Sequence, residues 1–447
     1  MSRAQRNGRT KESRYAPAAG AGVVNPRARQ RAFCISVLPP DLSRPDGRDD
    51  LAELKELLRT AGVAVAGELV QRRAQPDPNN YFGKGKLAQL KEALGESGAN
   101  LIAVDDELLP RQERNLEEAI GVPVIDRTAI ILDIFADHAH SAEGNLQVEL
   151  AQLEYNLARM RGLWTHLERL GGGIGTRGPG ESQIETDRRL ARDRIGQLKR
   201  RLERAERSRR LTRSRREESH TPRVALAGYT NAGKSTLLNA LTDAEVGVGA
   251  RLFHTLDPTT RSFRHDGRTY LVTDTVGFIR KLPHQLVEAF KATLEETVNA
   301  DLILHVADAS VPEEELDEMT AAVDDVLEEI GAGARPRLLV LNKIDQLDPD
   351  ERRMVAARHR DAVLVSALAG EGLEELRHRI EQKFRAGLES VELLVPYERG
   401  ALLSELHELA GDLEREDTAS GVRVKARVPA AVAERLRPYD LNGHEPA

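Results

Sequence analysis

A glycine-rich run of nine residues, 228–236, stands between an apolar stretch at residues 224–227 and a helical pattern at residues 237–241. The run fits G-x-x-x-x-G-K-[ST] in the strand, loop and helix context that a phosphate-binding loop needs. Its glycines let backbone N–H groups close around a phosphate chain at a helix N-terminus. We expect Lys234 to reach the β- and γ-phosphates of a nucleotide and the Ser235 hydroxyl to bind Mg²⁺. The nucleotide-binding candidates in this run are Gly228, Tyr229, Thr230, Asn231, Ala232, Gly233, Lys234, Ser235 and Thr236.

A second motif, D-x-x-G, ends the apolar run at residues 270–273. This run should form a strand beside the phosphate-binding loop in a parallel sheet, where ligands bind outside the carboxyl ends of the strands. We expect Asp274 to hold Mg²⁺ through a water molecule and the Gly277 N–H to meet a γ-phosphate. The motif comprises Asp274, Thr275, Val276 and Gly277.

Two further loops predict which base is bound. Asn342, Lys343 and Asp345 follow the apolar run at residues 338–341. The Asp345 carboxylate can accept hydrogen bonds from the N1–H and the 2-amino group of guanine, whereas adenine would leave a buried charge unpaired. After the last apolar run come Ser366, Ala367 and Leu368, which can present a backbone N–H to the guanine O6. Four such elements in this order are typical of regulatory GTPases.

Residues 251–261 lie between the first two motifs, in the position of a nucleotide-dependent switch. A switch needs a threonine whose hydroxyl meets Mg²⁺ and whose N–H meets the γ-phosphate, so that the segment is ordered in the triphosphate state. Thr255 is the predicted residue and the third metal ligand, with Thr259 and Thr260 as alternatives. The other nucleotide contacts expected in this segment are Phe253, His254, Leu256 and Asp257.

The residue after D-x-x-G predicts how fast hydrolysis is. Many GTPases carry a glutamine there, which orients the attacking water. This chain has Phe278, which can neither orient water nor accept a proton. The catalytic candidates are therefore Lys234, Thr255 and Gly277, and we expect slow unaided hydrolysis that a partner accelerates.

The composition is that of a globular protein of several domains. The chain has 447 residues, of which 40% are hydrophobic but only 4% aromatic, so its cores must be aliphatic. Cys34 is the single cysteine, which excludes an internal disulfide framework and predicts a cytoplasmic protein. The sequence shows neither a signal peptide nor a transmembrane span, so we expect no membrane partner.

The charge is unevenly distributed. The formal net charge is −7, yet residues 1–31 carry eight Arg or Lys against Glu12 alone. Residues 185–216 carry fourteen basic residues against five acids. Two basic segments on an acidic protein indicate a polyanionic partner, although the second segment is also compatible with a solvated helix face.

Hydrophobic periodicity predicts a multidomain α/β protein. After a disordered basic tail at residues 1–31, strands alternate with helices over 32–140, which predicts a parallel α/β domain. Apolar residues at helical spacing predict a long helical hairpin over 141–220, with a linker at its end from residue 212. The P-loop GTPase domain, with a doubly wound sheet, follows at 221–388, and a small C-terminal α/β domain at 389–447.

A glycine-rich loop at residues 171–182 joins the two predicted long helices. It contains G-x-G-x-x-G, but no strand precedes it, so a dinucleotide site is not expected. A hairpin needs only a few residues to turn, so these twelve are more than a turn requires. The loop is therefore either a flexible tip or a segment that contacts RNA. The RNA-contact candidates are Gly173, Gly175, Arg177, Gly178, Arg188 and Arg189.

The motif set together with residues 181–189, ESQIETDRR, resembles the HflX family of bacterial translational GTPases. The resemblance covers about residues 33–440 and rests on the phosphate loop, on residues 252–258 and on the D-T-V-G-F run. It implies a monomeric cytoplasmic GTPase that binds the large ribosomal subunit and its rRNA, splits ribosomes under stress or stalling, and is stimulated by the ribosome.

Two other functions remain open at this stage. One is a ribosome biogenesis GTPase that acts on a precursor of the large subunit, which the sequence does not separate from the first hypothesis. The other is a nucleotide-driven metabolic enzyme such as a kinase. Asp345 argues against ATP at the nucleotide site, and the sequence shows no pattern for an acceptor substrate.

Overall fold

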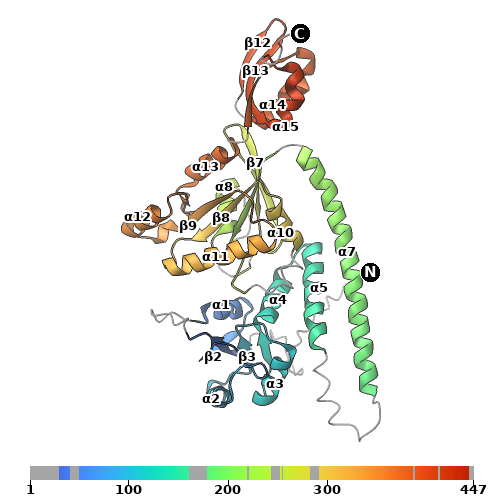
Figure 1. The fold of residues 1–447 in the computed structure, drawn as a ribbon, viewed down its shortest axis with the longest axis vertical. Helices are drawn as coiled ribbons and strands as arrows, with labels where there is room; N and C mark the ends of the chain where they lie inside the picture. The colour runs from blue at the N-terminus through green and yellow to red at the C-terminus, as the bar shows by residue number, and fades with distance from the viewer. Residues whose placement is uncertain are drawn as a thin grey trace, which may run out of the picture. The chain divides into compact units, whose positions relative to one another are not determined.

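The computed structural model describes residues 30–40, 50–160, 179–218, 221–242, 252–253, 255–281, 291–385, 388–410 and 413–441. The chain divides into two compact units (Figure 1). The first unit takes in the residues up to Asp137 together with Ala151–Ile195, and the second takes in His138–Leu150 and Gly196–Ala447. The predicted tail and tip residues 1–29 and 161–178 lie outside the described residues.

The first unit is built on a four-stranded sheet in the order β2-β1-β3-β4, in which every strand pair is parallel. Its strands are β1 Arg31–Leu38, β2 Ala64–Arg72, β3 Leu101–Val104 and β4 Val124–Asp126, and its helices are α1 Ala52–Thr60, α2 Lys84–Ser97, α3 Pro110–Ile120 and α4 Arg127–His138. All four residues of β3 are buried, as expected for a parallel strand covered on both faces. The predicted N-terminal parallel α/β fold is confirmed.

The helices expected over 141–220 are α5 Ala142–Arg159 and α7 Pro179–Glu218. The prediction of a linker from residue 212 is wrong, because α7 continues to Glu218. Arginine and glutamate are good helix formers, so the charged sequence at residues 213–218 sustains the helix without an apolar stripe. Arg188 of α7 is partly buried, and Arg189 is exposed.

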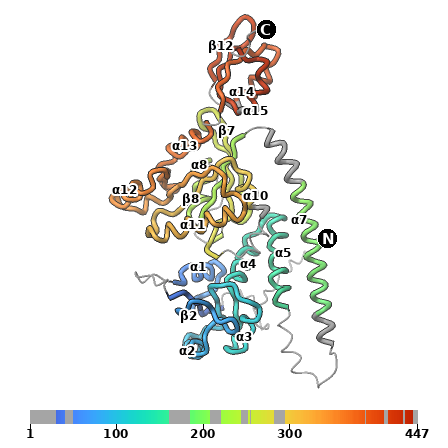
Figure 2. The backbone as a smooth tube through the Cα atoms, viewed as in Figure 1, coloured from blue at the N-terminus to red at the C-terminus, as the bar shows by residue number. Residues whose placement is uncertain are grey.

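The second unit holds a six-stranded sheet in the order β10-β9-β8-β5-β7-β6, parallel except for the β6–β7 pair. Its strands are β5 Arg223–Gly228, β6 Thr259–His265, β7 Arg268–Asp274, β8 Leu302–Asp308, β9 Arg337–Asn342 and β10 Val363–Leu364. Its helices are α8 Lys234–Thr242, α10 Lys291–Val298, α11 Glu313–Glu329, η2 Ile344–Gln346, α12 Pro349–Arg358 and α13 Leu373–Arg385. Leu338 and Val340 of β9 pack in one core with α8 and α13, whereas Leu341 packs in another with α11. Figure 2 traces the backbone of this sheet and its helices. Helices therefore cover both faces, and the predicted doubly wound sheet is confirmed.

The C-terminal part is a three-stranded antiparallel sheet in the order β11-β13-β12, with two helices packed against it. Its elements are β11 Leu388–Val395, η3 Tyr397–Arg399, α14 Gly400–Ala410, β12 Glu414–Thr418, β13 Gly421–Pro429, α15 Ala430–Leu436 and η4 Arg437–Tyr439. Side chains alternate along β13 between buried apolar and exposed basic residues, as its sequence predicts. Within the described part of the chain, no helix is both long and apolar enough to cross a membrane.

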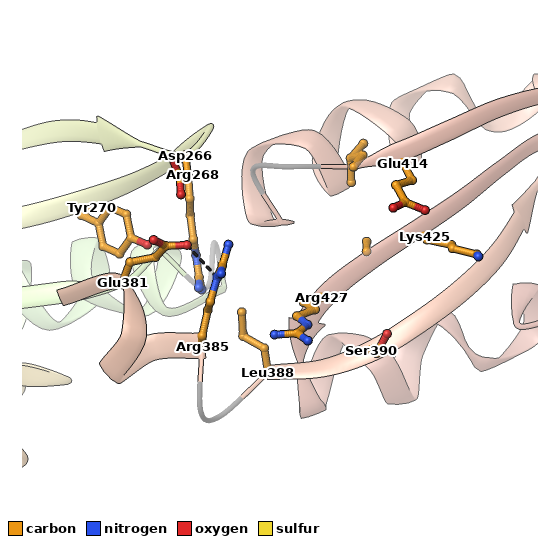
Figure 3. Close-up of a pocket in the computed structure, with 12 residues that line it drawn as sticks. Asp266, Arg268, Tyr270, Glu381, Arg385, Leu388, Ser390, Glu414, Lys425 and Arg427 are labelled. Carbon is orange, nitrogen blue, oxygen red and sulfur yellow. Dashed lines mark ion pairs between the residues drawn. The ribbon is translucent and has the colours of Figure 1, made fainter. Parts of the chain in front are cut away.

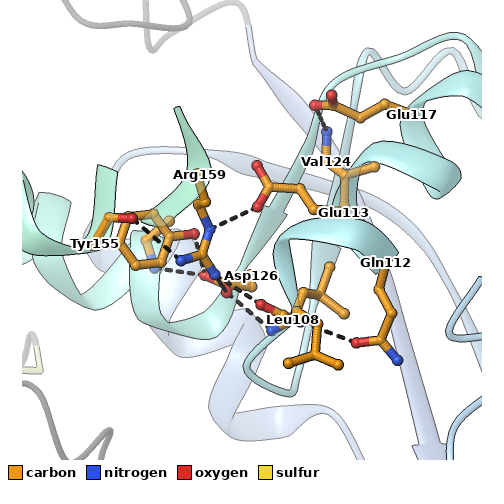
Figure 4. Close-up of polar contacts among 10 residues, drawn as sticks. Leu108, Gln112, Glu113, Glu117, Val124, Asp126, Tyr155 and Arg159 are labelled. Carbon is orange, nitrogen blue, oxygen red and sulfur yellow. Dashed lines mark hydrogen bonds and ion pairs between the residues drawn. The ribbon is translucent and has the colours of Figure 1, made fainter. Parts of the chain in front are cut away.

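A buried ion-pair network joins the last turn of α5 to the sheet of the first unit (Figure 4). Arg159 lies 2.8 Å from Asp126 Oδ2 and 2.7 Å from Glu113 Oε2, and its guanidinium stacks 3.5 Å from the centre of the Tyr155 ring. Tyr155 donates to Asp126 Oδ1 at 2.8 Å. Burial raises the pKa of Glu113, and Arg159 opposes that shift. Asp126 is fully buried, and its carboxylate accepts hydrogen bonds from Arg159 and Tyr155.

We expect Asp126→Ala to destabilise the first unit by about 3 to 5 kcal/mol, because it removes the fully buried one of the two carboxylates that pair with the Arg159 guanidinium. The measurement is urea unfolding of the full chain followed by circular dichroism. Glu56→Ala is the control, since its ion pair with Arg59 is exposed on α1 and should contribute at most about 1 kcal/mol. Equal midpoints for the two variants would contradict the prediction.

Candidate nucleotide-binding site

The phosphate-binding loop connects β5 to α8, and its lysine is enclosed by the loop. Lys234 is the first residue of α8, and its Nζ donates to the carbonyl oxygens of Gly228 at 3.0 Å and Tyr229 at 2.9 Å. Burial lowers the pKa of Lys234 to about 8, and the nearby Asp274 carboxylate opposes this shift. A phosphate oxygen at this point would meet a cation that has lost most of its water, which strengthens their attraction.

Asn342 ties three loops of the site together. Its Nδ2 donates to Ala232 O at 2.9 Å, and its Oδ1 accepts the Ala367 N–H at 3.0 Å. Gly233, at φ +91°, passes so close that an added Cβ would lie 2.2 Å from Asn342 Nδ2. The N-K-x-D motif therefore holds the phosphate loop and the Ser366 loop in place, in addition to its expected part in base recognition.

The predicted metal ligands lie together. The Ser235 hydroxyl donates to Asp274 Oδ2 at 2.6 Å and lies 2.8 Å from Thr255 Oγ1. Burial raises the pKa of Asp274, while Lys234 lowers it. Asp274 Oδ1 is buried and has no hydrogen-bond partner among the described residues. A carboxylate oxygen left in this way is costly unless a cation or its water shell meets it, and a set made only of oxygen donors fits Mg²⁺.

Of the three candidate threonines, Thr255 is the one whose hydroxyl contacts the phosphate loop. Thr260 lies in β6, and its Oγ1 is 2.9 Å from Thr273 Oγ1 on the neighbouring strand. Thr259 is the first residue of β6 and pairs in register with Asp274. Leu256 and Phe253 are buried, and His254 lies outside the described residues.

The D-x-x-G motif is joined to the phosphate loop by backbone hydrogen bonds. Phe278 N–H donates to Gly228 O at 3.1 Å, and Phe278 O accepts the Thr230 N–H at 2.7 Å. The Phe278 ring is completely buried. A Cβ on Gly277 would lie 2.8 Å from Thr230 Cγ2 and 3.0 Å from Lys234 Nζ, so only glycine fits against the loop.

On the base side, Asp345 accepts a hydrogen bond from Ser366 Oγ at 2.5 Å. The aliphatic stem of Lys343 extends from a left-handed backbone position at φ +65° to an ion pair with Asp308 Oδ2 at 2.5 Å. Leu368 is 82% exposed. Asp308 was not expected here, because an aspartate at the end of a strand carries no motif of its own.

Asp257 accepts hydrogen bonds from residues that lie far from it in the sequence. Its carboxylate accepts hydrogen bonds from residues 140 and 141, at the start of α5. The sequence analysis assigned this residue to the nucleotide and missed Ser141, since 116 positions separate the two residues. The nucleotide role of Asp257 stays a prediction.

A separate pocket of about 490 Å³ is drawn in Figure 3, and residues 228–236 of the phosphate loop are not among its lining residues. Residues of β6–β7, α13 and the C-terminal sheet line it, and an ion pair of 2.6 Å joins Glu381 to Arg385 within it. Its lining carries both signs of charge and no glycine-rich loop, which is unlike a nucleotide phosphate site.

A doubly wound sheet that carries G-x-x-x-x-G-K-[ST], a buried D-x-x-G motif and N-K-x-D at its strand ends defines a P-loop GTPase. Four family models match successive parts of the chain. They are the GTP-binding GTPase N-terminal model at residues 48–136, the GTP-binding GTPase middle region at 138–216, the 50S ribosome-binding GTPase model at 223–343 and the HflX C-terminal domain at 353–439.

Two similar proteins indicate the same family as the family models. The GTPase HflX of Caldanaerobacter subterraneus subsp. tengcongensis is 47% identical over 417 residues, which cover 93% of this chain and 95% of that relative. The GTPase HflX of Escherichia coli K12 is 45% identical over 394 residues, or 87% of this chain and 92% of that relative. This chain belongs to the HflX family of GTPases, which confirms the resemblance seen in the sequence.

Among solved structures, a GTP-binding protein from the archaeon Sulfolobus solfataricus in complex with GDP is 27% identical to this chain. The match covers 79% of this chain and 98% of that one, with a TM-score of 0.41.

We expect Gly233→Ala to weaken GDP binding by at least about tenfold, or about 1.4 kcal/mol, because a Cβ at this left-handed position would displace Asn342. The measurement is a fluorescence titration with a labelled GDP. Gly95→Ala is the matched control, since a Cβ at Gly95 in α2 meets nothing within 4 Å. Undiminished affinity in Gly233→Ala would show that the loop tolerates a side chain here.

The lowered pKa of Lys234 predicts a pH dependence of nucleotide affinity. A bound phosphate favours the charged lysine, so above a pH of about 8 the complex holds more protons than the free protein. Affinity for GDP should then fall as pH rises, by at most about tenfold per pH unit. Binding isotherms across this range measure the slope, and Lys234→Arg, which stays charged, should flatten it. A flat profile in the unsubstituted chain would count against a lysine that titrates here.

Proposed function

We propose that this chain is a GTP-driven factor that binds the large ribosomal subunit and its rRNA. It hydrolyses GTP slowly alone and faster on the ribosome, and it acts in the cytoplasm as a monomer. It acts on translating, stalled or idle ribosomes, which it splits or rescues under stress. The burial of Phe278 is the observation that carries the proposal.

Phe278 occupies the position from which a GTPase would orient the attacking water. Its ring is in the core and its backbone groups are hydrogen-bonded to the phosphate loop, so this residue offers neither a side-chain donor nor an acceptor to a water. The remaining site binds and positions a nucleotide but lacks a group that aligns the nucleophile. A partner that orders the switch segment or supplies the missing group would raise the rate, as such partners do for other GTPases.

The roles of the chain's own residues follow from this site. Lys234 neutralises charge on the β- and γ-phosphates, and the Gly277 N–H faces the γ-phosphate. Ser235, Thr255 and, through a water molecule, Asp274 would hold Mg²⁺, which would neutralise charge that develops on the phosphates. Asp345 selects guanine, with Ser366 holding its carboxylate in place.

Two observations support a ribosomal partner. The GTPase portion matches a family model described as a 50S ribosome-binding GTPase. Helix α7 exposes a series of basic side chains, which suits contact with RNA phosphates. They are Arg189, Arg192, Lys199, Arg200, Arg201, Arg204 and Arg207.

GTP hydrolysis by the full chain, alone and with purified large ribosomal subunits, tests this proposal. We expect stimulation of at least about tenfold, because the site lacks its own water-orienting group. Sedimentation of the GTP-analogue complex then identifies the bound particle, and preference for a precursor subunit would indicate a biogenesis role instead. No stimulation and no binding would overturn the ribosomal assignment.

The Arg200→Glu variant tests whether the basic face of α7 contributes to binding of the subunit. It should weaken subunit binding several-fold and flatten its salt dependence by about one to two units of slope, because it removes a phosphate-facing charge. Lys383→Glu on α13 is the matched control, since it makes the same charge change at an exposed position outside α7.

A further inference from the structure

The switch segment is attached to the N-terminus of helix α5. Asp257 Oδ2 accepts the backbone N–H groups of His140 at 3.1 Å and Ser141 at 2.7 Å, and its Oδ1 accepts the Ser141 hydroxyl. All of these residues belong to the second unit. We call this set of contacts the switch anchor.

The anchor has the features of a built carboxylate site. The Ser141 hydroxyl, besides donating to Asp257, accepts the Gly144 N–H at 2.8 Å and so caps the helix. Asn145 Nδ2 fixes the preceding turn by donating to Ala139 O at 3.1 Å and Ser141 O at 2.8 Å. A Cβ on Gly144 would lie 2.5 Å from Asp257 Oδ1, so the carboxylate fits only because residue 144 is glycine. The positive end of the helix dipole adds to these hydrogen bonds.

The anchor lies two residues from the threonine that contacts the phosphate loop. Thr255 Oγ1 is 2.8 Å from Ser235 Oγ, and the intervening Leu256 is buried. Consecutive Cα atoms are about 3.8 Å apart, so Asp257 restricts Thr255 to within about 7 Å of the anchor. Displacement of either residue must therefore move the other.

Helix α5 continues without interruption for 18 residues to Arg159. Its last turn is held within the first unit by the Arg159, Asp126 and Glu113 ion pairs (Figure 4). A continuous helix is stiff along its axis, because each turn is hydrogen-bonded to the next.

We propose that the switch anchor couples the nucleotide state to α5, with Asp257 as a positioning residue that acts through Thr255. With a triphosphate bound, Thr255 is ordered and Asp257 stays on the helix N-terminus; after hydrolysis, release of Thr255 weakens the anchor. By linkage, a partner that stabilises the anchored α5 raises hydrolysis. This inference rests on the GTPase activity alone and not on the ribosomal assignment.

Single-turnover GTP hydrolysis by the full chain tests the positioning role. Asp257→Ala should lower the rate about tenfold to a hundredfold, because a misplaced Thr255 loses its alignment. Ser141→Ala should show a smaller loss, Ser141→Thr should restore the rate, and the double variant should be no slower than Asp257→Ala. Asp325→Ala, which removes an exposed charge on α11, is the control.

Amide hydrogen exchange at residues 140–144 separates coupling from a structural role. If Asp257 were only structural, the exchange rate would not depend on which nucleotide is bound. Exchange should be slower with a non-hydrolysable GTP analogue than with GDP, and Asp257→Ala should abolish this difference. Equal exchange in both nucleotide states, or an unchanged hydrolysis rate in Asp257→Ala, would overturn the proposal. Loss of GDP binding and thermal stability together with the rate would indicate a folding defect and would likewise count against it.

Discussion

The burial of the Asp274 carboxylate at the end of β7 constrains the whole nucleotide site. A carboxylate removed from water has to find compensating partners, and here Ser235 and the nearby Lys234 provide them on one side. The strand order β5-β7 brings these residues together, since the parallel neighbours end at the same edge of the sheet. The remaining oxygen of Asp274 has no hydrogen-bond partner among the described residues, which suits a bound cation.

The site is well organised for binding and incomplete for hydrolysis. Asn342, Gly233 and the backbone hydrogen bonds of Phe278 hold the loops together, so little reorganisation is needed when a nucleotide binds. The side chain that would align a water is replaced by a buried phenylalanine. The proposed stimulation by a partner rests on this feature of the site.

Helix α5 takes part in both compact units through contacts that differ in kind. At its first turn, hydrogen bonds from backbone N–H groups and a serine hydroxyl hold a single carboxylate, which can be released without leaving a buried charge. At its last turn, Arg159 is buried with two carboxylates, and separating them would be costly. The hydrogen bonds to Asp257 at the first turn are therefore easier to break than the ion pairs of Arg159 at the last turn.

The sequence by itself determined the GTPase class, the family and the alternating α/β architecture. These features depend on local patterns: a glycine-rich loop between a strand and a helix, apolar runs of strand length, and the buried and exposed alternation of β13. It also located Phe278 after D-x-x-G, the residue on which the prediction of slow unaided hydrolysis rests. Helix ends were less certain, as the extension of α7 to Glu218 shows, because charged residues sustain a helix without an apolar period.

The tertiary structure alone decided which of three threonines contacts the phosphate loop, and that Asn342 joins the loops of the site. It alone brought Asp257 to Ser141 across 116 positions. Contacts of this kind depend on how the strands are ordered and where a helix begins. Hydrophobic periodicity predicts helices and strands, but it does not predict that two polar residues so far apart will pair.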